Sequence, residues 1–182
     1  MQVSMTVAMA KLKVLQDRMN KTMSFIVEHC ARDAKYKDPL EEHGGATKIV
    51  AQEIQSFMDL QTRYEGIKRA LDEANRTTKM TVHIDENGLK FHEERYLSEW
   101  LVWERVTSPV RESLFASIKM GMERKKSGAM RNVLQQGEKV EIENAVDLQY
   151  VEYQLALSHA VRIEENAAKS VLNTTTTIEI PD

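Results

Sequence analysis

Apolar side chains recur every three or four residues in the first part of the chain, and this spacing predicts two long helices. The first series lies in residues 5–30 and comprises Met5, Ala8, Leu12, Leu15, Met19, Thr22 and Ile26, widened by Met9, Met23 and Cys30. The second comprises Val50, Ile54, Phe57, Leu60, Tyr64, Ile67, Leu71 and Ala74. Because a helix about 40 Å long cannot bury its apolar stripe alone, we expect the two to form an antiparallel hairpin over residues 1–78.

The segment between these helices, residues 31–46, loses the pattern. It contains Asp38-Pro39 and Gly44-Gly45, which are typical of a loop. Thr47 then stands where an N-cap of the second helix is expected.

A change of period from 3.6 to 2 follows the second helix. Met80, Val82 and Ile84 alternate with polar residues, and Asn87-Gly88 precedes a second short run. Asn-Gly between alternating runs is a strong hairpin signal, so we expect a β-hairpin over residues 79–91.

A third helix is expected over residues 92–126, with Pro109 marking either a kink or the start of a new helix capped by Ser108. Trp100 and Trp103 lie in this stretch, and their volume suggests a junction between elements. The sequence then becomes basic and rich in small residues, which predicts a flexible basic arm over residues 127–137.

The tail, residues 138–182, predicts a strand, a helix and a second strand. The first strand is expected at residues 139–143, and Asp147 is the expected N-cap of the helix. The helix ends in Asn173-Thr174-Thr175-Thr176, which echoes Asn75-Arg76-Thr77-Thr78 before the hairpin. Each junction passes a helix into a strand, and the two strands are candidates to pair within one chain or between subunits. The junction residues are Asn75, Thr77, Thr78, Asn173, Thr175 and Thr176.

These junctions also carry a resemblance. A helix ending Glu73-Ala74-Asn75-Arg76-Thr77-Thr78, the turn at Gly88, and a later unit with Val146-Asp147 before a helix ending in Asn-Thr-Thr resemble the septicolysin-like family of small helical bacterial proteins. The resemblance extends over residues 50–180 and implies a helical, self-associating fold.

Composition supports a mainly α fold. The chain has 182 residues with only 7 Gly and 3 Pro, too few for the turns of a many-stranded β-protein. We therefore expect one helical domain over residues 1–182: a long antiparallel helical hairpin or bundle, with a small β-hairpin and short strands at helix ends. The lone Cys30 fits a reducing compartment, and no secretory signal precedes it, so the expected location is cytoplasmic, or in the virion for a phage protein.

The sequence predicts no enzyme. It lacks a Gly-x-Ser-x-Gly elbow, a Cys-x-x-Cys pair and a Walker loop. No Glu lies three residues before any His, which excludes the di-iron bundle motif. A zinc site at His29, Cys30 and His43 is disfavoured, because adjacent helical residues point about 100° apart. We therefore expect no catalytic residue, cofactor or metal.

Two classes of function remain. The first is a non-enzymatic structural or interaction protein that assembles as a homo-oligomer, in a phage or bacterial accessory complex. The second is an oligomeric protein that sequesters a small anion such as a nucleotide. A membrane-active protein comes third, because the Met-rich stripe of residues 1–30 lies beside basic residues, although such a stripe is more typical of a core or a coiled-coil seam. The net charge of −3 argues against nucleic acid as a partner. The candidate anion- or partner-binding residues are Lys119, Arg124, Lys125, Lys126, Arg131, Trp100 and Trp103.

Overall fold

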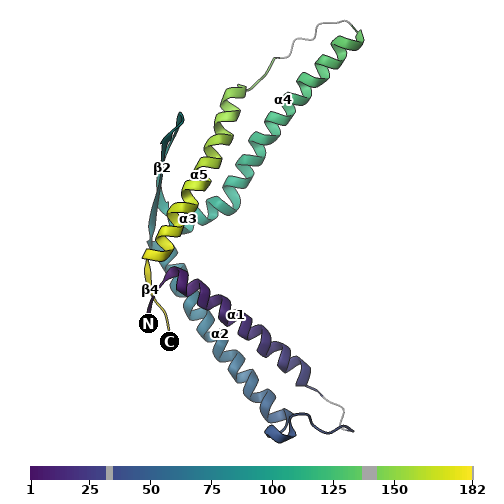
Figure 1. Cartoon of the computed structure of the whole chain (residues 1–182), viewed down its shortest axis with the longest axis vertical. Helices are drawn as coiled ribbons and strands as arrows, with labels where there is room; N and C mark the ends of the chain where they lie inside the picture. The colour runs from purple at the N-terminus through teal and green to yellow at the C-terminus, as the bar shows by residue number, and fades with distance from the viewer. Residues whose placement is uncertain (32–34, 137–142, 182) are drawn as a thin grey trace. The chain divides into compact units, whose positions relative to one another are not determined.

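The chain is mainly α-helical and divides into two compact units, where we expected one domain (Figure 1). The computed structural model describes residues 1–31, 35–136 and 143–181, with the backbone alone for residues 130–136. Unit 1 comprises Met1–Asn75 and Leu172–Asp182, and unit 2 comprises Arg76–Val171. Unit 2 is therefore inserted, in sequence, between two segments of unit 1.

Unit 1 is built on the predicted helical hairpin, whose helices α1 (Met5–His29) and α2 (Ala46–Thr77) run antiparallel (Figure 1). The apolar stripe of α1 faces inward as predicted at its seven main positions, none of which is exposed. Met9, Met23 and Cys30, which were expected to widen it, are exposed because they point away from α2. Ile67 and Leu71 of α2 are buried with Met5, Ala8 and Leu15 of α1.

The loop before α2 differs from the prediction in one respect, because Thr47 does not cap the helix. Helix α2 begins at Ala46, whose backbone N–H donates to Asp38 Oδ2 at 2.8 Å. The other oxygen, Oδ1, accepts from the backbone N–H of Leu40 at 2.9 Å. One carboxylate thus holds both ends of the turn that enters the helix. Gly44 and Gly45 have φ of 103° and 88°, which glycine adopts without strain.

The two ends of the chain close unit 1, and we call this contact the terminal clasp. Strand β1 (Gln2–Ser4) pairs antiparallel with β4 (Thr177–Glu179), with Val3 opposite Ile178. The Met1 ammonium donates to the Ile180 carbonyl at 2.8 Å, and the Ile180 N–H donates to the Met1 carbonyl at 3.0 Å. Ile178 and Ile180 are buried, so the clasp contributes directly to the core.

Unit 2 begins with the predicted β-hairpin, in which β2 (Lys79–Glu86) pairs with β3 (Leu89–Tyr96). Asn87 and Gly88 have φ of 51° and 77°, as a type I′ turn requires. Met80, Val82 and Ile84 are buried on one face. The hairpin is longer than predicted, because residues 92–96 belong to β3 and not to the third helix.

The third helix is irregular just before Pro109, as the sequence indicated, and the irregularity is a π-helical turn. Helix α3 (Leu97–Val102) continues through the π-helical turn η2 (Trp103–Thr107) into α4 (Ser108–Gln136). Proline lacks an N–H and disrupts the regular helical ladder, which accounts for a π turn just before Pro109. The predicted kink is therefore a local widening of one continuous helical segment.

Helix α4 corrects the predicted flexible arm, because residues 127–136 are helical. Residue 137 and residues 139–142 of the strand expected at 139–143 lie outside the described residues, and Glu143 is not in a strand. Helix α5 (Leu148–Thr175) runs beside α4 (Figure 1). Asp147 caps it as predicted, accepting from the Gln149 N–H at 3.0 Å.

Candidate functional site

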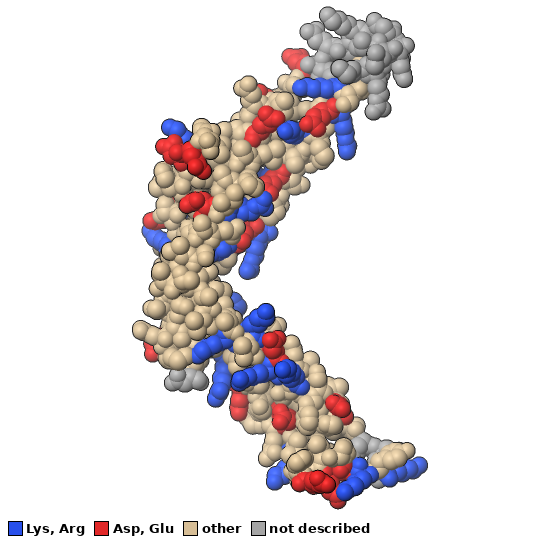
Figure 2. All heavy atoms as spheres, in the orientation of Figure 1, with Lys and Arg blue, Asp and Glu red and all other residues tan. Residues whose placement is uncertain are grey.

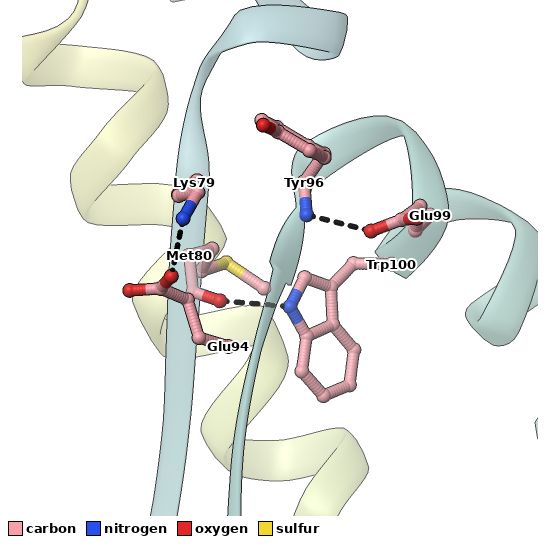
Figure 3. A network of polar contacts seen from close by, with 6 residues as sticks. All are labelled: Lys79, Met80, Glu94, Tyr96, Glu99 and Trp100. Atoms are coloured by element: carbon pink, nitrogen blue, oxygen red, sulfur yellow. Dashed lines mark hydrogen bonds and ion pairs between the residues drawn. The ribbon is translucent and has the colours of Figure 1, made fainter.

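The two tryptophans predicted as a binding surface are instead buried in unit 2. Trp100 is 0% and Trp103 is 6% exposed, and their rings meet edge to face at 5.6 Å between centroids. Trp100 Nε1 donates to the Met80 carbonyl of β2 at 2.9 Å (Figure 3). The Arg95 guanidinium lies 5.0 Å from the Trp100 ring centroid. These rings join the hairpin to α3, which confirms the junction predicted for them, and neither offers a face on which a ligand could stack.

The predicted basic residues lie on α4 and do not meet the tryptophans. Along a helix, the 21 residues between Trp103 and Arg124 correspond to about 32 Å. Lys119 Nζ lies 3.0 Å from Glu152 Oε1 of α5, and this pairing raises the Lys119 pKa through the hydrogen bond and the carboxylate charge. Arg124, Lys125 and Lys126 are exposed, while the side chain of Arg131 lies outside the described residues. Within one chain, the basic residues and the tryptophans are therefore not brought together.

The Asn-Thr-Thr junctions form two separate strand pairs. Strand β2 pairs with β3 and β4 pairs with β1, so the two strands do not pair with each other. Both helices also extend two residues beyond the Asn, ending at Thr77 and Thr175.

The backbone at these junctions is used within the chain. The Thr78 carbonyl accepts from the Leu97 N–H at 2.8 Å, and the Thr176 carbonyl accepts from the Met5 N–H at 3.1 Å. The Asn173 carbonyl accepts from the Thr6 hydroxyl at 3.0 Å. The junctions therefore fix helix starts inside each unit.

A polar seam joins α4 and the preceding η2 turn to α5, and sequence reasoning missed it. Arg111 bonds Gln154, and Glu112 Oε2 lies 3.3 Å from Arg162 Nη1. Further along, Lys169 Nζ lies 2.7 Å from Glu104 Oε2. The spacing of residues in α5 could have predicted the seam. Its buried positions recur at intervals of three and four, at Gln154, Ser158, Val161 and Glu165, and all of these but Val161 are polar.

Glu165 is the residue of this seam whose burial costs the most free energy, because its carboxyl group is buried without a hydrogen bond among the described residues. Its side chain is 0% exposed, and neither carboxyl oxygen has a hydrogen-bond partner among the described residues. Lys169 Nζ lies 3.7 Å from Oε1. Burial raises the Glu165 pKa, the Lys169 charge opposes that shift, and the Glu104 charge adds to it.

An open groove in unit 1 was also not predicted. It lies between α1 and α2 with a cavity volume of about 420 Å³. Its apolar lining is Val7, Ala10, Val14, Leu15, Ile67 and Pro181, and its basic lining is Lys11, Arg18 and Arg63. Neither Arg18 nor Arg63 has an acidic partner within the described ranges. Figure 2 shows basic side chains gathered over the α1–α2 pair.

The described ranges contain no group of three or more His, Cys, Asp or Glu side chains placed to hold a metal ion. Within the same ranges, none of the helices combines the length and the hydropathy that crossing a bilayer requires. The resemblance to the septicolysin-like family stays a prediction. Comparison of the chain with protein-family models, curated proteins and solved structures finds no match.

Proposed function

We propose that this chain is a non-enzymatic structural protein that assembles with further copies of itself through one face of α3, η2 and α4, as a component of a phage or bacterial accessory complex. The observation that supports this most strongly is a row of exposed apolar residues four apart. Val102, Val106, Val110 and Leu114 are 59%, 58%, 66% and 56% exposed. Single exposed apolar residues are ordinary, but a continuous row of them is typical of an interaction surface.

The row continues along α4 with small residues. Val110, Leu114, Ser117 and Gly121 are spaced by four, three and four residues, as in a coiled-coil seam, and all are exposed. We call the series Val102, Val106, Val110, Leu114, Ser117 and Gly121 the outer face. It carries no charged side chain, so a second helix can be packed against it without burying a charge.

Gly121 adds an independent argument for a partner helix. Glycine inside a helix costs about 1 kcal/mol relative to alanine. A Cβ at position 121 would meet nothing within 4 Å, so no packing within the chain requires a glycine there. Close approach of a second backbone is a physical reason for glycine at such a position.

A second copy is the occupant that fits this face best. An apolar face without charge is complementary to itself, and a two-fold dimer places the same face on both partners. Among the described residues, 19 large apolar side chains are exposed while 16 apolar residues are buried. Self-association would cover some of these exposed apolar side chains.

Val110→Glu tests the proposal, measured by sedimentation equilibrium at micromolar concentration. Its charge would have to be buried in the interface, so the oligomer is expected to dissociate while far-UV circular dichroism stays unchanged. Ile163→Glu is the matched control, because Ile163 is 57% exposed on α5 of the same unit. A wild-type monomer at these concentrations, or equal association of both variants, contradicts the proposal.

Gly121→Ala provides a second, opposite test. Alanine is expected to raise helix stability by about 1 kcal/mol in the isolated chain. Its methyl group would separate two closely packed helices, so association is expected to weaken at the same time. A variant that is more stable and associates as well as wild type would remove Gly121 from the interface.

The groove of unit 1 favours a second candidate function, the binding of a small anion. Its apolar lining and its two arginines, which have no acidic partner among the described residues, fit an alkyl carboxylate. The alkyl chain would lie against Val14 and Leu15, and the carboxylate would face Arg18 and Arg63. Its volume is within the range of ligand sites, about 300–1,000 Å³.

Titration calorimetry with decanoate tests this function. Arg18→Gln and Arg63→Gln are expected to weaken binding, whereas Arg69→Gln is the control, because Arg69 is paired with Glu65 at 3.6 Å on the same helix. Heat that is unchanged in all three variants contradicts the assignment. A thermal shift with nucleotides and none with decanoate would assign a different anion to the chain.

A further inference from the structure

Two histidines face each other on the exposed side of the β-hairpin. His83 of β2 and His92 of β3 are directly opposite in the register. Their Nδ1 atoms lie 3.2 Å apart, with the rings at 72° to each other and 5.3 Å between centroids. Both side chains are exposed, so solvent and ions reach them.

We propose that His83 and His92 chelate one divalent transition-metal ion of the class that prefers imidazole, such as Zn²⁺, Ni²⁺ or Cu²⁺. Imidazole nitrogens bind zinc at about 2.0–2.1 Å. Two nitrogens 3.2 Å apart then subtend an angle of about 100° at the ion, close to the tetrahedral angle. The observed spacing therefore fits a shared ion without movement of the backbone.

The hairpin holds this spacing in place. Directly opposite residues of an antiparallel pair have Cβ atoms about 4.5–5.5 Å apart, and the pairing here runs without interruption from Lys79–Tyr96 to Glu86–Leu89. Met80, Val82 and Ile84 on the other face are buried, which fixes the side of the hairpin that the histidines occupy. A preorganised pair loses little conformational entropy when it binds an ion.

The surroundings leave the remaining coordination positions to water. Glu94 on the same face is engaged with Lys79 at 2.7 Å. Asp85 is two residues from His83 on this face and lies opposite Lys90, and neither has an ion pair with another described residue, so their two charges leave little net charge beside the ion. Without the ion, one imidazole donates its Nδ1 hydrogen to the bare Nδ1 of the other, and an ion would replace that hydrogen.

Titration calorimetry of the full chain with Ni²⁺ tests the proposal. We expect one Ni²⁺ per chain, and affinity at least tenfold lower in His83→Asn and in His92→Asn. The matched control is His43→Asn, an exposed histidine in the loop before α2 of unit 1, which is expected to bind as wild type does. No heat at millimolar Ni²⁺, or binding unchanged in both hairpin variants, overturns the proposal.

A spectroscopic readout separates metal binding from a purely structural role. With one equivalent of Cu²⁺, the electron paramagnetic resonance spectrum of wild type is expected to show coupling to two nitrogens. His83→Asn that retains native circular dichroism is expected to show coupling to one nitrogen at most. An identical spectrum in wild type and the folded variant contradicts chelation by this pair.

Discussion

The buried indole of Trp100 allows the contribution of one hydrogen bond to be measured. Trp100→Phe keeps an aromatic ring but removes the Nε1 donor that lies 2.9 Å from the Met80 carbonyl. Met80 also pairs with Arg95 across the hairpin, so its carbonyl keeps its partner in the sheet and the substitution removes one of two hydrogen bonds, a loss of about 0.5–1.5 kcal/mol. The loss of buried ring volume adds a cavity cost of about 1–2 kcal/mol. We therefore expect Trp100→Phe to lower the free energy of unfolding of unit 2 by about 1.5–3.5 kcal/mol.

Trp103→Phe is the matched control for this substitution. Trp103 is 6% exposed, and its indole nitrogen has no hydrogen-bond partner among the described residues, so its replacement carries the cavity cost alone. The difference between the two variants should therefore be about 0.5–1.5 kcal/mol. In urea, with a slope of about 1–3 kcal/mol per molar, such a difference moves the midpoint by roughly half a molar.

Fluorescence provides the assay, because each variant retains one tryptophan as a reporter of unit 2. Equilibrium unfolding in urea is followed by emission and by circular dichroism. Equal destabilisation of the two variants, within about 0.5 kcal/mol, would refute the contribution of the Trp100–Met80 bond. A stable Trp100→Phe variant would further refute the burial of the ring.

Three further predictions concern local features. The folded-state pKa of Glu165 is raised above its unfolded value, so the stability that its protonated form contributes is present below pH 4.5 and is lost as the pH rises through the folded-state pKa. Glutamine does not ionise, so the stability of Glu165→Gln relative to wild type should increase between pH 4 and pH 7, as measured in thermal melts. A Cβ at Gly66 would lie 2.8 Å from Pro181 Cγ, so Gly66→Ala should loosen the terminal clasp and speed hydrogen exchange of the Ile180 amide. Adding Pro181→Ala should restore the slow exchange, and effects of the two substitutions that simply add would contradict this contact. Gly88→Ala should destabilise the hairpin by about 1–2 kcal/mol, because φ is 77° there; an unchanged urea midpoint would contradict it.

Local patterns predicted the elements well, because they depend on near neighbours in sequence. The stripe of α1, the Asn87-Gly88 turn and the Asp147 cap are all set within a few residues, and all are confirmed. Boundaries were less accurate where a tertiary contact decided them. Residues 92–96 extend the hairpin because they pair with β2, a choice that their own helix-like pattern could not reveal.

The site predictions failed for a different reason. Trp100 and Trp103 occupy the predicted junction, where their large apolar area is buried between the hairpin and α3, and this leaves neither ring free for a ligand. Val106, Val110 and Leu114 recur at a helical spacing, yet they are exposed, because α5 packs on another side of the helix. Periodicity identifies a face of a helix but not the element that covers it. The groove brings together Arg18 and Arg63, which are about 45 positions apart in the sequence. Local sequence patterns extend over only a few residues, so they could not predict this groove.

The terminal clasp also sets an order for folding during synthesis. The ribosome synthesises all of unit 2 before residues 172–181, and those residues supply β4 and the buried Ile178 and Ile180 of unit 1. Unit 2 can thus complete its contacts while α1 and α2 still lack their last strand. Domains generally fold as they emerge, so the first helices made belong to the unit that is finished last. During that interval the Met5 N–H at the start of α1 lacks the Thr176 carbonyl that accepts from it in the finished unit.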